Sequence, residues 1–164
     1  MLRQLEGKVQ VYLPDLKYAL PEPARRYSGA EDYFQWASAA ILEMFRQTGP
    51  YVMENGQLKR GVLIRHLLLP GEMENTRRCI DFVAGHFQPG EVLFSLMSQY
   101  TPQPGAGGTF RRHVTRAEYR AVGGVYGKLR HHRRLQPRSG PLPKRNTPRI
   151  LTAGACKRAA GCPV

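Results

Sequence analysis

The chain has 164 residues and a hydrophobic content of 41%, which is enough apolar material for the core of one folded domain and excludes a chain that is disordered throughout. Residues 1–110 carry 11 basic and 11 acidic side chains, whereas residues 111–164 carry 14 basic side chains and one acidic one. The net charge of +13 therefore belongs to the C-terminal part, and the two parts are expected to differ in structure and function.

Alternating strand and helix patterns fill the first part of the chain. Residues 9–13 are rich in β-forming side chains, and residues 32–47 carry apolar side chains at spacings of three and four, which predicts a strand and then an amphipathic helix. The nearly unbroken apolar run 61–69 is typical of a strand covered on both faces. A second helix is predicted over residues 72–87 and a third strand over 92–97. This βαβαβ order predicts an α/β fold with a parallel sheet, and antiparallel folds do not fit it.

The remaining segments are expected to be irregular. A loop is predicted around Pro21, Pro23, Ser28 and Gly29, and the pair Asn55-Gly56 predicts a turn. After Gly105 the periodic pattern ends; residues 116–122 can form one helical turn or two, and Gly123-Gly124 break the pattern after them. The chain is therefore divided into an α/β part, residues 1–110, and a Pro- and Gly-rich basic tail, residues 111–164, that is expected to be disordered.

The predicted sheet is incomplete by itself. Three strands do not close a barrel, and both outer strands leave an unpaired edge unless something else joins them. We therefore expect the chain to be part of a larger sheet. No apolar run reaches the roughly 18 residues of a membrane span, and the N-terminus lacks the apolar stretch of a secretory signal, so we expect a cytoplasmic protein without a membrane partner.

The candidate site residues lie where strands end, because parallel α/β folds place their working residues at the carboxyl ends of strands. Asp15 and Lys17 follow the first predicted strand, and Gln99 follows the third. Arg65 lies inside the second, where a cation costs several kcal/mol unless it is paired or faces a polar site. Spacing alone favours a solvated strand end for Asp15 and Lys17. A histidine such as His66 is more often a hydrogen-bonded core residue than a ligand.

Four segments read in order are more specific than these single residues. YLPDLKYA, ARRYSGAEDYF, LKRGVLIRHLLLPGEMENT and SLMSQYTP resemble, over about residues 3–122, the radical S-adenosylmethionine proteins related to the pyruvate formate-lyase activating enzyme. The resemblance implies the second half of a partial (β/α) TIM-like barrel. It also implies an enzyme that, when complete, uses a 4Fe-4S cluster to cleave S-adenosylmethionine reductively to a 5′-deoxyadenosyl radical, with a glycyl-radical enzyme or another protein as substrate.

The resemblance also assigns roles to single residues. Asp15 and Lys17 match the family's D-x-K motif, which implies a carboxylate facing the ammonium of the methionine end of the cofactor and a lysine facing its carboxylate. Arg65 matches the arginine of an I-R-x-x-x-x-P-G strand, a further candidate for that carboxylate. Gln99, or Tyr100 beside it, stands where the activating enzymes place a histidine, so Gln99 is the third candidate contact.

The largest departure from the family is that the sequence contains no CxxxCxxC. The three cysteines are scattered, so neither a disulfide framework nor metal ligands are expected. The resemblance therefore implies that catalytic residues of the complete enzyme are missing, and that this chain is inactive alone. A half-barrel that complements a separately encoded N-terminal half carrying the cysteines is an alternative.

Two interpretations of the basic tail compete. In one, the tail binds nucleic acid non-specifically through phosphate contacts, although it lacks the interleaved aromatic side chains of single-strand binders. In the other, which we favour, the tail arises from a frameshift. Codons for residues 126–135, YGKLRHHRRL, read one nucleotide later permit MENCGITDGF, and in a further frame those for residues 144–151 permit EEYTPDFD; both products look like the family.

Overall fold

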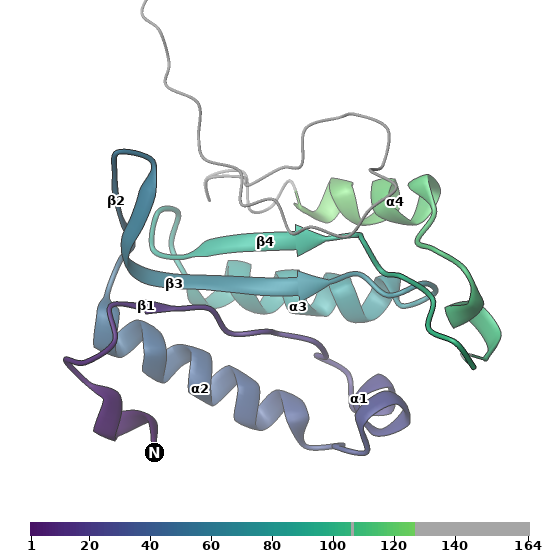
Figure 1. The fold of residues 1–164 in the computed structure, drawn as a ribbon, viewed down its shortest axis with the longest axis horizontal. Coiled ribbons are helices and arrows are strands. Elements are labelled where there is room, and N and C mark those ends of the chain that lie inside the picture. The colour runs from purple at the N-terminus through teal and green to yellow at the C-terminus, as the bar shows by residue number, and fades with distance from the viewer. Residues whose placement is uncertain (106, 127–164) are drawn as a thin grey trace, which may run out of the picture.

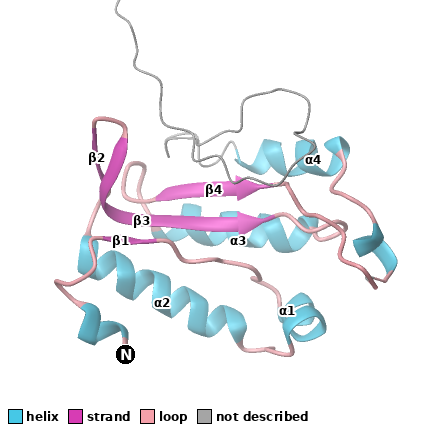
Figure 2. Cartoon of the chain, in the orientation of Figure 1, coloured by secondary structure: helices cyan, strands magenta, loops and turns pink. Residues whose placement is uncertain are grey.

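A small mixed sheet with helices packed on it organises the chain (Figure 1). The structure, a computed structural model, describes residues 1–105 and 107–126. Its strands are β1 (Val11–Tyr12), β2 (Val52–Glu54), β3 (Gln57–Leu67) and β4 (Leu93–Met97). Its helices are α1 (Pro21–Ser28), α2 (Tyr33–Thr48), α3 (Met73–His86) and α4 (Arg116–Tyr126), with short 3-10 helices η1 (Leu2–Leu5) and η2 (Gly108–Arg111). Figure 2 shows these elements by type.

The central strand β3 pairs in parallel with β1 on one side and with β4 on the other. Val11 lies opposite Gly61, and the register between β3 and β4 runs from Leu63 opposite Leu93 to Leu67 opposite Met97. The expected α/β fold with parallel strands is therefore confirmed for these three strands. The described strands form an open sheet and do not close into a barrel.

The core lies on one face of the sheet. Val62, Ile64 and Leu68 alternate along β3 and its end, and each is fully buried. They pack in one cluster with Ile41 of α2 and Ile80 of α3, so both helices cover this face. The side chains between them are only half-buried, and no described helix packs over the opposite face. The expectation that this strand is covered on both faces is therefore wrong for the part of the chain that the structure describes.

The predicted loop is a helix, and the predicted turn belongs to a hairpin. Pro21 and Pro23 begin helix α1, because a helix needs no N–H donor in its first turn, and Gly29 ends it in the left-handed conformation at φ 63°. Asn55 and Gly56 also have positive φ, and the turn they form joins β2 to β3 as an antiparallel hairpin. The prediction of the turn was thus right, but the hairpin makes β3 four residues longer than expected at its start.

Helix α4 extends beyond the one or two turns expected there and packs against α3. Val114 and Val122 are buried and belong to the core cluster. Residues 111–126 therefore pack with the α/β part of the chain. Both the nucleic-acid interpretation of the tail and its frameshift interpretation rest mainly on residues 127–164, which lie outside the described residues.

A capping box begins α4. The Thr115 hydroxyl accepts the Glu118 N–H at 3.2 Å, and the Glu118 carboxylate accepts the Thr115 N–H at 2.8 Å. The same carboxylate accepts the Gly71 N–H at 2.9 Å and pairs with Arg112 at 2.7 Å, so it ties α4 to the loop after β3. The Arg112 guanidinium, together with the backbone donors, holds the pKa of Glu118 well below its usual range.

Replacing Glu118 by alanine should lower the free energy of unfolding by about 1–2 kcal/mol, because the helix loses its cap and the Gly71 N–H loses its acceptor. Urea unfolding followed by circular dichroism measures the difference. Glu22→Ala is the control, since that glutamate also lies in the first turn of a helix but makes only an exposed pair with Arg26 at 3.6 Å. Equal effects of the two substitutions would contradict the structural role of Glu118.

Candidate functional site

Asp15 and Arg65 form an ion pair at the carboxyl end of β1 and β3. The backbone continues the parallel pairing there, since the Arg65 N–H donates to Pro14 O and the Leu16 N–H to Arg65 O, both at 2.9 Å. The Arg65 Nε and one terminal guanidinium nitrogen each lie 2.8 Å from Asp15 Oδ1. Both side chains are about two-fifths exposed, at 42% and 41%, so a small molecule can reach the pair from solvent.

The pair lies on the face of the sheet that α2 and α3 leave uncovered. Arg65 alternates along β3 with Ile64 and His66, which are buried on the helix-covered face. Ser95 of β4 is its neighbour in register. The loops that follow the strands, with α1, lie at the end toward which the strand arrows point (Figure 1). The site is therefore open from the uncovered face and bordered by loops at its carboxyl end.

Lys17 lies close to the pair along the chain, and Tyr33 of α2 fixes its backbone. The Tyr33 hydroxyl donates to Asp15 O at 2.6 Å and accepts the Lys17 N–H at 3.0 Å. Burial raises the pKa of Tyr33, so its hydroxyl remains a donor near neutral pH. The Lys17 side chain is exposed, and no described residue forms an ion pair with its ammonium group. Lys17 thus has a fixed backbone, and its long, flexible side chain is available to a ligand.

Asn75 of α3 holds the segment that follows Lys17. Its side-chain oxygen accepts the N–H groups of Ala19 at 2.8 Å and Leu20 at 3.2 Å, and its Nδ2 donates to Lys17 O at 2.9 Å. Asn75 is only 1% exposed. A single buried amide therefore satisfies three backbone groups of an irregular segment, which otherwise have no regular hydrogen-bonding partner.

His66 is a buried core histidine, as expected. Its Nδ1 lies 2.6 Å from Leu16 O and its Nε2 lies 2.9 Å from Thr76 Oγ1. Because a carbonyl only accepts, Nδ1 carries the proton, and neutral Nε2 accepts from the threonine hydroxyl. Burial lowers the pKa of His66 to about 4. His66 therefore positions the backbone at Leu16, between Asp15 and Lys17, without contacting a ligand itself.

Gln99 is the predicted site residue that the structure does not bring to the ion pair. It is exposed, two residues beyond the end of β4, and forms no hydrogen bond with Asp15 or Arg65. Its neighbour Tyr100 is half-buried and donates its hydroxyl to Phe110 O at 3.2 Å, so Tyr100 is directed into the following loop. Of the four candidates, Asp15 and Arg65 are in contact, Lys17 lies two residues from Asp15 along the chain, and Gln99 forms no hydrogen bond with the pair.

Tyr33, Asn75 and Thr76 support the site but were not singled out from the sequence. One signal was available for two of them. Asn75 and Thr76 precede Cys79 and Ile80 by four residues, which places both polar side chains on the core-facing side of the predicted helix. Buried polar side chains are almost always hydrogen-bonded, so this position indicates a fixed structural partner. Tyr33 gave no such signal, because an aromatic residue at the start of a helix is common.

The described residues do not fit an iron-sulfur cluster. Cys79 is the only cysteine among them; it is fully buried in α3, and burial raises the pKa of its thiol, which disfavours the thiolate that a cluster binds. Residues 1–105 and 107–126 contain no group of three or more His, Cys, Asp or Glu side chains placed to hold a metal ion. The other two cysteines lie outside the described residues, so no cluster chemistry is assigned to this chain.

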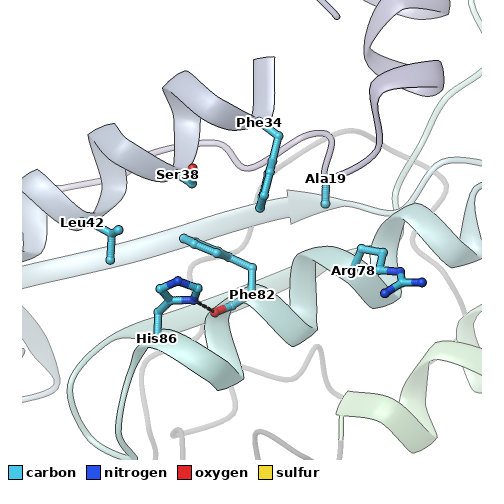
Figure 3. A pocket seen from close by; sticks show the side chains of 7 residues that line it. All are labelled: Ala19, Phe34, Ser38, Leu42, Arg78, Phe82 and His86. Carbon is cyan, nitrogen blue, oxygen red and sulfur yellow. Dashed lines mark hydrogen bonds between the residues drawn. The ribbon is translucent and has the colours of Figure 1, made fainter. Parts of the chain in front are cut away.

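A separate groove of about 320 Å³ lies between α2 and α3 (Figure 3). Phe34 and Phe82 meet edge to face within it, with ring centroids 5.4 Å apart, and His86 Nδ1 donates to Phe82 O at 2.9 Å. The groove is formed by the helices on the covered side of the sheet, whereas Asp15 and Arg65 project from the other side. It is therefore not part of the candidate site.

The fold and the site place the described residues in the mixed α/β class, with a charged pair at the carboxyl end of adjacent parallel strands. No protein-family model matches the chain, and comparisons with curated proteins and with solved structures give no significant match. The relationship to radical S-adenosylmethionine proteins therefore stays a prediction from the four quoted segments. Among the described helices, none has the length and apolar character needed to cross a membrane.

Proposed function

We propose that the chain forms the part of a radical S-adenosylmethionine enzyme that binds the amino-acid end of S-adenosylmethionine. In this proposal the described strands belong to the second half of a partial (β/α) barrel. The observation that carries it is the Asp15–Arg65 pair, which lies where parallel α/β folds bind ligands and remains open to solvent. The order and spacing of the four family-like segments also support it.

The chemistry of the three side chains suits a zwitterionic ligand. The Asp15 carboxylate accepts from an ammonium group, and the Arg65 guanidinium donates two parallel hydrogen bonds to a carboxylate. Lys17 adds a second cation that reaches the same carboxylate as a flexible point charge. The ligand would replace the existing ion pair with two new ones. Tyr33, Asn75 and His66 hold the backbone of residues 15–20, so the segment that carries Asp15 and Lys17 is positioned before the ligand arrives.

The cofactor, when bound in a complete enzyme of this family, supplies the 5′-deoxyadenosyl radical. The described residues hold no cluster ligands, so the role we propose for this chain is to bind and orient the methionine end. Activity then requires thiolate ligands from outside the described residues. A glycyl-radical enzyme or another protein remains the proposed substrate of the complete enzyme.

Titration of the chain with S-adenosylmethionine in a calorimeter tests this function. Arg65→Ala should weaken binding about 30-fold, or about 2 kcal/mol, which is typical of a hydrogen bond to a charged group. Arg60→Ala is a matched control, because Arg60 is an exposed arginine near the start of the same strand and far from its carboxyl end. Its affinity should equal that of the wild type.

Two results would contradict the proposal. The first is a wild-type chain that shows no binding of S-adenosylmethionine at millimolar concentration. The second is an Arg65→Ala variant with unchanged affinity and a lower melting temperature, since Arg65 would then be a structural ion-pair partner of Asp15 and nothing more.

A further inference from the structure

Three polar side chains form a row across the uncovered face of the sheet. Asp15, just after β1, lies opposite Arg65 of β3 in parallel register, and Arg65 lies opposite Ser95 of β4. Residues in register on parallel strands point to the same face, so Ser95 shares the face of the ion pair. The row therefore carries an anion, a cation and a neutral hydroxyl, in that order from β1 to β4.

The hydroxyl of Ser95 is available to a ligand. Ser95 is half-buried, and within residues 1–105 and 107–126 its hydroxyl has no hydrogen-bond partner. The Arg65 guanidinium lies 2.8 Å from Asp15, so it is directed toward β1 and does not bond Ser95.

The neighbours of Ser95 on this face of β4 do not supply a partner either. They are Leu93 and Met97, which stand two residues before and after it, and both are apolar. A partly desolvated hydroxyl among apolar side chains gains free energy when it acquires a partner. Because a carboxylate only accepts hydrogen bonds, Ser95 would donate to it, as Arg65 does.

The row fits the polar end of an α-amino acid. Neighbouring strands are about 4.8 Å apart, so the row spans roughly 10 Å between Asp15 and Ser95. An amino acid that bridges it needs two hydrogen bonds of about 2.8 Å and about 3.5 Å between its nitrogen and its far carboxylate oxygen, together about 9 Å. The acceptor for an ammonium group stands at one end of the row, and both donors for a carboxylate stand beyond it.

We propose that Ser95 binds the carboxylate of the ligand together with Arg65. The amino-acid end then lies with its ammonium group on the β1 side and its carboxylate on the β4 side. Ser95 thereby makes the site specific for ligands with a free α-carboxylate. This role rests on the proposed function, to which it adds a fourth binding side chain and the direction in which the ligand lies.

Calorimetric titration of the full chain with S-adenosylmethionine and with its decarboxylated analogue tests this role. The analogue keeps the ammonium and sulfonium groups but offers no carboxylate to Ser95. Ser95→Ala should weaken the binding of S-adenosylmethionine about tenfold, as expected for the loss of one hydrogen bond to a charged group. The affinity for the analogue should stay the same within about twofold, because the analogue never makes that bond.

Ser38→Ala is the matched control, because Ser38 lies on α2, which covers the other face of the sheet, and its hydroxyl donates to Gln35 O at 3.2 Å. It should leave both affinities unchanged. Equal losses for the two ligands in Ser95→Ala would overturn the role of Ser95, since the residue would then support the site without contacting the carboxylate.

The variant Arg65→Ala separates this role from the proposed function. If Arg65→Ala weakens the binding of S-adenosylmethionine and Ser95→Ala does not, the role of Ser95 is wrong and the proposed function stands. A wild-type chain that binds neither ligand at millimolar concentration overturns both.

Discussion

Replacing Asn75 by alanine should lower the free energy of unfolding by about 3 kcal/mol. The substitution removes one partner from three hydrogen bonds and leaves backbone groups of Lys17, Ala19 and Leu20 unsatisfied, each at a cost of roughly 1–3 kcal/mol that partial access of water reduces. Chemical unfolding monitored by circular dichroism gives the difference. Residues 15–20 should also lose protection in hydrogen exchange, because Asn75 is the side chain that fixes this segment to α3.

Glu74→Ala is the control for Asn75→Ala. Glu74 is the preceding residue of α3, and its pairs with Arg77 at 3.4 Å and Arg78 at 3.0 Å lie on the exposed side of the helix. Its loss should change the free energy of unfolding by less than about 0.5 kcal/mol. If Asn75→Ala behaves like this control and residues 15–20 keep their protection, the segment is held by something other than the Asn75 amide.

Acidification should destabilise the protein by about 3 kcal/mol between pH 6.5 and pH 4 through His66 alone. The unfolded chain takes up a proton on this residue near pH 6.5, whereas burial lowers the pKa in the folded protein to about 4. The contribution of His66 is therefore fully present above pH 6.5 and is lost progressively as pH falls toward 4. Unfolding free energies measured at several pH values should show this slope.

The variant His66→Gln isolates this effect, because glutamine keeps a donor and an acceptor in the site and does not titrate there. It should be less stable than the wild type at pH 7, and the difference between the two proteins should shrink as pH approaches 4. Carboxylates with lowered pKa values, such as Glu43 at about 2, contribute equally to both proteins and cancel in the difference. Parallel pH profiles for the two proteins would show that His66 is not buried in neutral form.

The regular elements with strong periodicity were predicted from the sequence. The expected helices over residues 32–47 and 72–87 correspond to α2 and α3 within one residue at each end, and the third strand corresponds to β4. Each of these segments buries one continuous face, so the spacing of its apolar residues indicates which side packs against the core. Helix α1 replaces the loop predicted around Pro21 and Pro23, because both prolines lie in its first turn, where proline is tolerated.

The hairpin was missed for a different reason. Strand β2 has only three residues, none of them fully buried, so no alternating pattern marks it. The turn at Asn55-Gly56 was recognised, but its consequence for β3 depends on pairing across the hairpin. Whether a short strand forms at the margin of a sheet depends more on its pairing with a neighbouring strand than on its own sequence.

The charged residues of the site could be predicted from the sequence, but the residues that hold its backbone in place could not. Asp15 follows β1 and Arg65 lies two residues before the end of the neighbouring parallel strand β3, so both lie near the carboxyl ends of paired strands and their contact follows from topology. Gln99 was expected at the same place, but it is exposed after the end of β4 and forms no hydrogen bond with the pair. The supporting bonds of Tyr33 and Asn75 go to backbone groups of an irregular segment, and no sequence pattern encodes the path of such a segment.

The preformed contact between Asp15 and Arg65 has a consequence for selectivity among small molecules. A simple anion that binds Arg65 leaves the Asp15 carboxylate without its counter-ion. A simple cation that binds Asp15 leaves the Arg65 guanidinium without its counter-ion. A molecule with an α-amino and an α-carboxylate group gives each side chain a new partner of opposite sign in one event. In the proposed function we therefore expect the pair to bind amino acids and their derivatives more tightly than inorganic ions, monocarboxylic acids or simple amines.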